Sequence, residues 1–306
     1  MKITVCFDKL SPDPWVQGLQ SALPQARVSA WSPGAAQADW AIVWTPPQQF
    51  IDEQPGLQAL FNIGAGVDAL LKLQLPPGLK VVRLDDAGMS VQMAEYVCHA
   101  VIRHFRELDG YDADAQAGKW SYRKPRSRSD FPVGVMGLGV LGQRVARALK
   151  VFDFPVNGYS RSPKQLDGVR CYAGPEALPA FLQASRVLVN LMPLTPETEN
   201  ILNHTTLSQL QKGGYVINVA RGSHLVDEDL LSLIDSGHLA GATLDVFRTE
   251  PLPAAHPFWQ HPKISVTPHT SARTLREESI AQISGKILAL QRGEPINGVV
   301  DPGRGY

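Results

Sequence analysis

The sequence predicts an α/β protein with two domains, each built on a doubly wound parallel sheet. Short apolar runs alternate with helical patterns along the chain of 306 residues. Strands that are apolar on both faces are typical of parallel sheets, because helices cover each side of such a sheet. Regular alternation of strand and helix favours the doubly wound arrangement, and the length of the chain favours two domains over one.

The predicted strands are short segments rich in aliphatic residues. Helical patterns lie between most of them, as parallel pairing requires. In chain order the strands are Ile3–Phe7, Trp40–Trp44, Leu60–Ile63, Val81–Leu84, Val133–Gly137, Val156–Tyr159, Val187–Leu191, Tyr215–Val219, Ala242–Val246 and Ile264–Thr267.

Two longer helices and one polar connection complete the predicted organisation. Met93–Leu108 carries an apolar stripe typical of an amphipathic helix. A last helix, from about Leu275 to Arg292, is expected to return the chain to the first domain. Residues 118–132 (KWSYRKPRSRSDFPV) are basic, polar and interrupted by Pro125 and Pro132. This stretch predicts an exposed connection.

Composition and charge point to a small-molecule partner. Lys plus Arg equals Asp plus Glu at 29 each, so neither a nucleic acid nor an anionic membrane surface is expected to bind. The three cysteines, Cys6, Cys98 and Cys171, are widely spaced and suggest neither a disulfide framework nor a metal site. The first residues are expected to form a strand rather than a signal peptide. No apolar run is long enough to span a membrane, and a cytoplasmic location is expected.

The strongest local signal is a glycine-rich turn, GLGVLG, at residues 137–142. This turn comes directly after the predicted strand that begins at Val133, and a helical pattern follows it. In this setting Gly137 permits a tight turn, Gly139 lets the backbone approach a pyrophosphate, and Gly142 lets the helix pack close to the strand. The free N–H groups at the start of the helix then bind the phosphates. The motif predicts a dinucleotide-binding domain.

The residues after the next strand indicate which dinucleotide is bound. NAD-binding domains carry an acidic residue at this point, which accepts hydrogen bonds from the adenosine ribose. Here the strand is followed by Ser160, Arg161, Ser162 and Lys164, with no carboxylate among them. A 2′-phosphate attracts such hydroxyl and cationic groups, and Arg can bind it through two N–H donors. The sequence therefore predicts NADP(H) in preference to NAD(H), although an exposed polar turn is the alternative explanation.

An arginine, a glutamate and a histidine follow three of the predicted strands in the second domain. Arg221 can bind a carboxylate through two hydrogen bonds. His269 can donate a proton to a carbonyl oxygen while a hydride reaches the carbon. Glu250, beside the histidine, would stabilise the imidazolium form. Each residue type also has structural uses at strand ends, so the residues alone leave this interpretation open.

Several ordered motifs resemble the D-isomer-specific 2-hydroxyacid dehydrogenase family. They are VGVMGLGVLG (133–142), NLMPLTPET (190–198), NVARGSHLVDEDLL (218–231), LDVFRTEPLP (244–253) and VTPHTSA (266–272). The branch of the family that the chain most resembles is the glyoxylate/hydroxypyruvate reductase A type. The segments behind this are FNIGAGVDALL (61–71), YSRSPK (159–164), PFWQHPKISVTPH (257–269) and VDPGRGY (300–306).

The resemblance implies roles for particular residues. Arg221, Glu250 and His269 match the catalytic residues of the family. The implied substrate-binding residues are Trp44, Ala65, Gly66, Val67 and Arg221; Trp44 fits a core position equally well. The implied cofactor-binding residues are Gly137, Gly139, Val140, Leu141, Gly142, Ser160, Arg161, Ser162, Lys164, Met192, Pro193, Thr198, Val219, Ala220, Arg221, Asp245 and His269. Asp245 is expected to face the nicotinamide amide, although a structural role is also open.

The resemblance further implies two Rossmann-like or flavodoxin-like domains. They are a discontinuous substrate domain, residues 1–99 plus 276–306, and an NADP-binding Rossmann domain, residues 100–275. It implies a homodimer that reduces small 2-ketoacids with NADPH, glyoxylate to glycolate and hydroxypyruvate to D-glycerate. One alternative is another D-2-hydroxyacid dehydrogenase, of the phenylpyruvate, D-lactate or phosphoglycerate type. A more distant one is a nucleotide-sensing binding protein on the same fold.

Overall fold

The computed structural model describes residues 1–301 and 303. The chain forms two compact units, one made of Met1–Met89 and Arg273–Tyr306 and the other of Ser90–Ala272. The first boundary lies before the predicted division at residues 99 and 100. It does so because helix α3, Met89–Phe105, contributes its buried side chains to the core of the second unit.

The first unit contains a five-stranded sheet in the order β2-β1-β3-β4-β5. All its strand pairs are parallel, and the order is that of flavodoxin-like folds. The strands are β1 (Lys2–Phe7), β2 (Arg27–Ala30), β3 (Trp40–Trp44), β4 (Ala59–Asn62) and β5 (Lys80–Val82).

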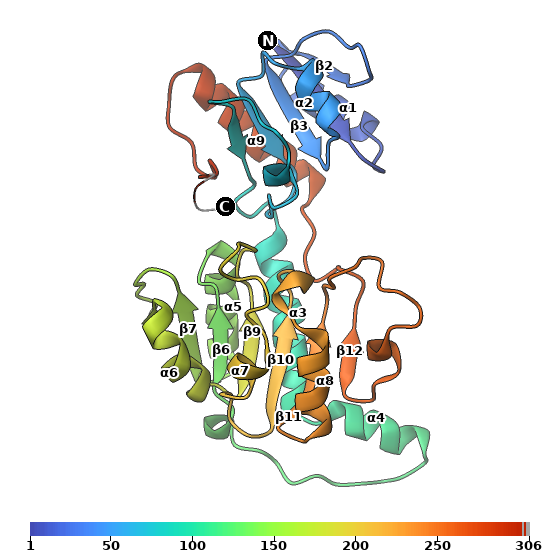
Figure 1. Cartoon of the computed structure of the whole chain (residues 1–306), viewed down its shortest axis with the longest axis vertical. Coiled ribbons are helices and arrows are strands. Elements are labelled where there is room, and N and C mark those ends of the chain that lie inside the picture. Colours follow the sequence, from blue (N-terminus) through green and yellow to red (C-terminus); the bar gives the residue numbers. More distant parts are fainter. Residues whose placement is uncertain (302, 304–306) are drawn as a thin grey trace. The chain divides into compact units, whose positions relative to one another are not determined.

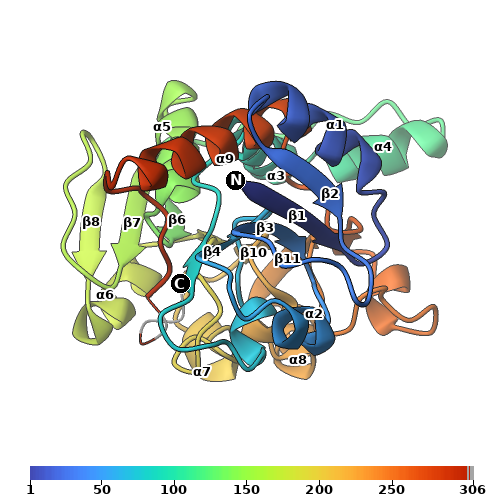
Figure 2. The same cartoon turned by 90° about the horizontal axis from the view of Figure 1, so that it is seen from above.

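Helices cover both faces of this sheet. On one face lie α1 (Asp13–Ala22) and α9 (Arg276–Gln291), and on the other lies α2 (Gln48–Glu53), as Figure 2 shows. The side chains between α1, α9 and the sheet are fully buried or nearly so, including Leu19 and Ile283. Burial of each such side chain stabilises the fold by about 1.5–3 kcal/mol.

The C-terminal segment is tied to the first unit by polar contacts as well as by packing. The Lys286 ammonium lies 3.0 Å from the Asp85 carboxylate and donates to the Arg83 carbonyl at 3.0 Å. The Leu275 amide donates to the Ala87 carbonyl. These contacts explain why the last helix belongs to the unit in which the chain begins.

The second unit contains a seven-stranded sheet in the order β12-β11-β10-β9-β6-β7-β8. Its pairs are all parallel. The order reverses between β6 and β9, and ligands of such sheets bind beyond the carboxyl ends of the strands at this point. The strands are β6 (Val133–Met136), β7 (Val156–Ser160), β8 (Arg170–Ala173), β9 (Val187–Asn190), β10 (Gly214–Asn218), β11 (Leu239–Leu244) and β12 (Ile264–Val266).

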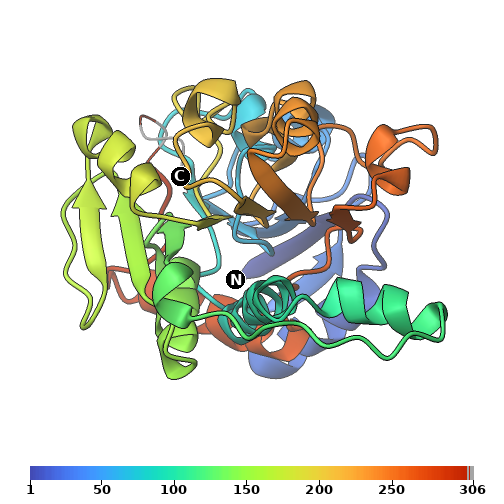
Figure 3. The ribbon, with the colours of Figure 1, turned by 90° about the horizontal axis from the view of Figure 1, so that it is seen from below.

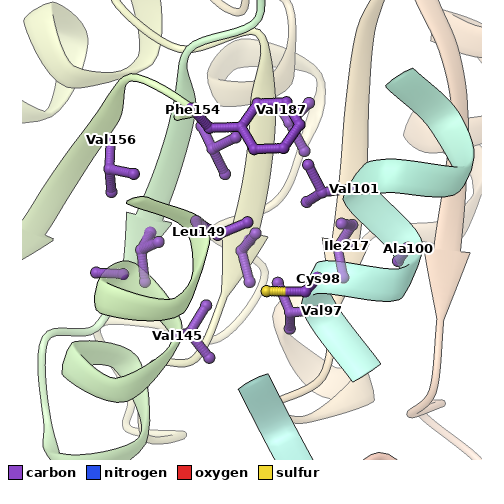
Figure 4. Close-up of a cluster of buried hydrophobic side chains, with 14 of the residues drawn as sticks. Val97, Cys98, Ala100, Val101, Val145, Leu149, Phe154, Val156, Val187 and Ile217 are labelled. Carbon is purple, nitrogen blue, oxygen red and sulfur yellow. The ribbon is translucent and has the colours of Figure 1, made fainter. Parts of the chain in front are cut away.

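Helices α3 and α5 (Val140–Val151) cover one face of this sheet, and the other helices of the sheet connections cover the opposite face (Figure 3). Those on the opposite face are α6 (Leu178–Gln183), α7 (His204–Leu207) and α8 (Asp227–Asp235). Figure 4 shows the core between α3, α5 and the strands, where Val97, Val101, Val145, Leu149 and Val187 meet. All five are fully buried, as the apolar stripe of α3 predicts.

A helix and an extended connection run outside these layers (Figure 1). After α3 the chain passes through Glu107, which adopts a left-handed conformation, into α4 (Leu108–Gln116). The residues that follow form neither helix nor strand until a 3₁₀ turn at Arg128–Asp130. Arg123 pairs with Asp114 at 2.6 Å in this region. Among residues 1–301 and 303, no helix is both long and apolar enough to cross a bilayer.

Candidate active site

The glycine-rich turn joins β6 to α5 at the point where the strand order reverses. Gly137 has a φ of 100°, and a β-carbon there would overlap the backbone of Leu191, just beyond β9. A β-carbon at Gly142 would overlap the Gly137 carbonyl, so the helix packs directly on the turn. Gly139, by contrast, faces open space and is the N-cap of α5. Since this N-cap has no side chain, the first N–H groups of α5 remain for an anion such as a pyrophosphate.

The residues at the end of β7 divide into a buried serine and an exposed cationic turn. The Ser160 side chain is buried, and its hydroxyl donates to the Ser162 carbonyl at 2.8 Å. Arg161, Ser162 and Lys164 are exposed. The Ser160 hydroxyl therefore shapes the turn, and the two cationic side chains lie at its surface.

Three fully buried polar side chains connect the carboxyl ends of β9 and β10. Asn190 donates to the Asn218 side-chain oxygen and to the His224 Nδ1, each at 3.0 Å. Since the Asn190 amide group donates to Nδ1, the other ring nitrogen, Nε2, is the one that donates to the Pro193 carbonyl, at 3.2 Å. Buried polar groups that satisfy one another in this way rigidify their surroundings.

This network holds the two loops that follow the strands. The Asn190 side-chain oxygen accepts from the Met192 amide at 3.2 Å. The Asn218 side chain donates to the Arg221 carbonyl at 3.0 Å. The Thr198 hydroxyl adds a bond to the Pro193 carbonyl at 2.8 Å. The predicted cofactor residues at 192, 193 and 198 and the predicted carboxylate-binding residue at 221 thus share one supporting network.

Arg221 lies on a turn that packs against the segment leading to Glu250. A β-carbon at Gly222 would overlap the backbone of Phe247 and Arg248, so glycine permits the close approach. The Arg221 guanidinium donates to the carbonyl of Ala220 at 2.7 Å. Val219 and Ala220, predicted to contact the cofactor, are themselves largely buried.

The side chains of His269 and Glu250 are hydrogen-bonded to each other at the same edge of the sheet. His269 Nδ1 lies 2.8 Å from Glu250 Oε2, and the other Glu250 oxygen accepts from the Phe247 amide at 2.9 Å. The two side chains are 44% and 36% exposed, so a ligand can reach the imidazole. Burial acts to raise the pKa of Glu250. The hydrogen bonds from His269 and Phe247, with the charges of His269 and Arg221, outweigh burial and lower that pKa.

The backbone of His269 is strained. Its φ is 52°, a left-handed conformation that a residue with a β-carbon rarely adopts. Such a conformation costs about 1–3 kcal/mol and persists only when its surroundings hold it. Here the His269 amide donates to the Asp245 carbonyl at 2.8 Å. Asp245 is fully buried, with its carboxylate bonded to the residues around His269.

The predicted substrate loop lies in the first unit, after β4. The Asn62 side chain donates to the carbonyls of Gly64 and Gly66 at 3.0 and 2.8 Å, which fixes the curvature of the loop. The Trp44 ring packs on Gly64 so closely that a β-carbon there would overlap it. Trp44 is half-buried and also contacts the apolar core of this unit. It therefore supports the loop while serving as a core residue.

Several polar residues behind the site were missed in the sequence. They are the fully buried Asn190, Asn218 and His224, together with the half-buried Thr267 and Tyr96, which bond toward Asp245. One signal was available for the asparagines, because the apolar strand segments VLVN and GYVIN each end on one. A buried strand that ends on a polar residue requires partners for that residue.

Comparison with known proteins adds independent information. A model of the D-isomer specific 2-hydroxyacid dehydrogenase NAD binding domain matches residues 98–271. The chain is 47% identical over 313 residues to the glyoxylate/hydroxypyruvate reductase A of Serratia proteamaculans, with 100% of both chains covered.

Solved structures of members of the same family are also similar to this chain. A D-isomer specific 2-hydroxyacid dehydrogenase from Xanthobacter autotrophicus, in complex with NADPH and MES, superimposes with a TM-score of 0.95 at 39% identity, covering 100% of this chain and 99% of the other. An NADPH-dependent glyoxylate/hydroxypyruvate reductase from Sinorhizobium meliloti, in complex with NADP and sulfate, gives a TM-score of 0.94 at 34% identity with the same coverage. The chain therefore belongs to the D-isomer specific 2-hydroxyacid dehydrogenase family.

Proposed function

We propose that this chain reduces small 2-ketoacids with NADPH, converting glyoxylate to glycolate and hydroxypyruvate to D-glycerate. The observation that carries the proposal is the 2.8 Å contact between His269 Nδ1 and Glu250 Oε2, at the edge of the sheet where Arg221 also lies. The names of the relatives from Serratia and Sinorhizobium, and the NADPH bound to the structure from Xanthobacter, support this substrate class and this cofactor.

In the proposed reaction Arg221 binds the substrate carboxylate through two N–H donors and orients the adjacent carbonyl. The cofactor supplies a hydride to the carbonyl carbon. His269 gives the proton from Nε2 to the carbonyl oxygen, because Nδ1 is bonded to Glu250. The C=O double bond becomes a C–O–H group, and the imidazole is left neutral. Glu250 stabilises the imidazolium before transfer.

Other residues of the proposed substrate site lie in the first unit. We assign Trp44 and the backbone N–H groups of Ala65, Gly66 and Val67 to substrate binding, as the resemblance implies. The hydrogen bonds of Asn62 to this loop support a fixed loop shape. A preformed loop binds a small anion without the entropic cost of ordering.

The cofactor is proposed to bind along the carboxyl ends of the strands of the second unit. Its pyrophosphate would lie at Gly139 and the start of α5, with Val140 and Leu141 in the first turn. Its 2′-phosphate would contact Arg161, Ser162 and Lys164, whose exposure leaves them accessible. The nicotinamide would lie beside Met192, Pro193, Thr198, Val219, Ala220, Arg221, Asp245 and His269.

Replacing Arg161 by alanine tests the cofactor assignment. The unmodified chain is expected to prefer NADPH over NADH, and the variant to lose about tenfold or more of that preference, because a charge-assisted phosphate contact contributes about 1.5–3 kcal/mol. The measurement is kcat/KM for each cofactor at saturating glyoxylate. Arg147→Ala, which removes another exposed arginine from the same unit, should leave the preference unchanged. Equal use of both cofactors by the unmodified chain would refute the assignment.

We also propose that the chain forms a homodimer through α4 and residues 117–127. Trp120 and Tyr122 in this connection are 102% and 84% exposed. None of the nine residues of α4, all within the described part of the chain, is buried. So short a helix is marginal without packing against another surface. A second copy related by a two-fold axis would supply that surface.

The cytoplasmic location of the protein remains a prediction from the sequence.

Light scattering tests the dimer. The unmodified chain is expected to show twice the mass of one chain, and a variant with Trp120→Ser and Tyr122→Ser is expected to dissociate at lower protein concentration, since aromatic anchors carry much of the energy of an interface. Val151, an apolar residue of α5 that is 77% exposed, provides the control as Val151→Ser. A monomeric unmodified chain, or a double variant that dimerises as tightly, would argue against this interface.

A further inference from the structure

The segment that carries His269 is folded around the carboxylate of Asp245, the residue that follows β11. The Asp245 Oδ1 accepts from the Thr270 amide and Oδ2 from the Ser271 amide, both at 2.8 Å. The Thr267 hydroxyl donates to Oδ1 at 2.6 Å. The carboxylate therefore binds the residues on both sides of His269.

The main chain of Asp245 holds the same segment. Its carbonyl accepts from the His269 amide at 2.8 Å, and its amide donates to the Asn218 carbonyl at the end of β10. Because His269 has a φ of 52°, its turn would relax toward an ordinary conformation if these bonds were lost. Relaxation would change the direction of the imidazole and its 2.8 Å contact with Glu250.

A tyrosine of α3 extends the chain of hydrogen bonds. The Tyr96 and Thr267 hydroxyl oxygens are 2.5 Å apart. Since Thr267 donates its own hydrogen to Asp245, Tyr96 is the donor in this contact. Burial is the main cause that raises the pKa of Tyr96 to about 12, so its hydroxyl keeps its proton. Tyr96, Thr267 and Asp245 thus form a continuous relay of donors that ends on the carboxylate.

We infer that Asp245 is a positioning residue for the proton donor: its carboxylate, supported by Thr267 and Tyr96, holds the strained turn that aims His269. This inference rests on the proposed role of His269. It assigns Asp245 a function in addition to the nicotinamide contact that the resemblance implies. Three accepted hydrogen bonds already occupy the carboxylate, and a carboxylate offers about four acceptor positions.

The two functions of Asp245 predict different mutant kinetics. Asp245→Asn keeps the shape but replaces one acceptor with an NH₂ group and removes the charge. If Asp245 acts through His269, we expect kcat to fall by about 10–100-fold, as for partial loss of a general acid. NADPH affinity, measured by nicotinamide fluorescence, should change much less. If Asp245 acts mainly on the cofactor, NADPH affinity should fall along with kcat.

A double-mutant cycle that combines Asp245→Asn with His269→Ala decides between the two functions of Asp245. Residues that act as one unit have non-additive effects. We therefore expect Asp245→Asn to lower kcat strongly in the unmodified chain but by less than about twofold in the His269→Ala background. Full additivity, or a single Asp245→Asn variant with unchanged kcat, would overturn the inference while leaving the proposed function intact. If His269→Ala alone leaves kcat unchanged, the proposed proton donor is wrong, and the inference fails with it.

Two further variants keep the inference testable if Asp245→Asn does not fold. Thr267→Val removes the hydroxyl with little change of shape, and Tyr96→Phe removes only the end of the relay. We expect Thr267→Val to lower kcat more than Tyr96→Phe does. Neither substitution should lower kcat further in the His269→Ala background. They replace Asp245→Asn in the cycle should that variant not fold. Asp235→Asn, an exposed position at the end of α8, is the matched control and should leave kcat unchanged.

Discussion

Replacing His269 by alanine is expected to lower kcat for glyoxylate and hydroxypyruvate by about 10²–10⁴, the range that a positioned general acid contributes. The physical reason is that hydride addition leaves negative charge on the carbonyl oxygen, which without a nearby proton must be neutralised by water. The contact of His269 with Glu250 at 2.8 Å holds the imidazole in one orientation. The measurement is the steady-state rate of NADPH oxidation at saturating substrate.

Glu250→Gln is the companion variant. It keeps a side chain of the same shape but removes the charge that stabilises the imidazolium, so its kcat should lie between those of the unmodified chain and His269→Ala. The lowered pKa of Glu250 means that the carboxylate stays ionised to lower pH than an ordinary glutamate. A His269→Ala variant with kcat within a few-fold of the unmodified chain would show that the proton comes from elsewhere.

Replacing Arg221 by alanine is expected to lower kcat/KM for 2-ketoacids by about 10²–10⁴, because two charge-assisted hydrogen bonds to a carboxylate contribute about 3–6 kcal/mol together. Most of the loss should appear in KM if the arginine binds substrate and transition state alike, and in kcat if it also polarises the carbonyl. The measurement is full substrate saturation at constant NADPH.

Arg221→Lys is the control for geometry. A lysine keeps the charge but lacks the planar fork of N–H groups, so it should recover only part of the lost activity. The Arg221 main chain is held by Asn218, and either substitution should leave that bond in place. A normal KM and kcat in Arg221→Ala would mean that another group binds the carboxylate.

Much of the fold was predictable because the central strands are apolar on both faces. The strands that were missed are β2 and β8, with sequences RVSA and RCYA. Both lie at an edge of their sheet and are partly exposed, so neither forms the continuous apolar run that marks a central parallel strand. Edge strands owe their conformation to pairing with a neighbour, which the local sequence does not reveal.

The boundary between α3 and α4 was unpredictable for a different reason. The predicted helix Met93–Leu108 continues the apolar stripe that packs on the sheet, but the observed helix ends at Phe105. Glu107 then turns the chain with a φ of 55°. Glutamate is a good helix former, so tertiary contacts rather than local preference determine the break. One such contact is the ion pair of Glu107 with Arg126 at 2.8 Å.

The candidate site shows the same division between local and tertiary information. His269, Glu250 and Gly137 lie in motifs whose chemistry or backbone requirement is visible in the sequence. The strained backbone of His269 and the bonds that hold it are invisible there, because they join residues far apart in the chain. Asp245 was singled out for a cofactor contact with a structural role left open, but the sequence does not show that the buried carboxylate bonds the residues around His269.

The most direct test of the proposed function is turnover by the unmodified chain. Glyoxylate, hydroxypyruvate and larger 2-ketoacids are supplied in turn with NADPH or NADH, and the loss of the reduced nicotinamide absorbance is followed together with formation of the 2-hydroxyacid. We expect stoichiometric conversion, with the two small substrates and NADPH giving the highest kcat/KM. Binding of NADPH without turnover of any 2-ketoacid would contradict the proposed function and favour a nucleotide-sensing protein instead.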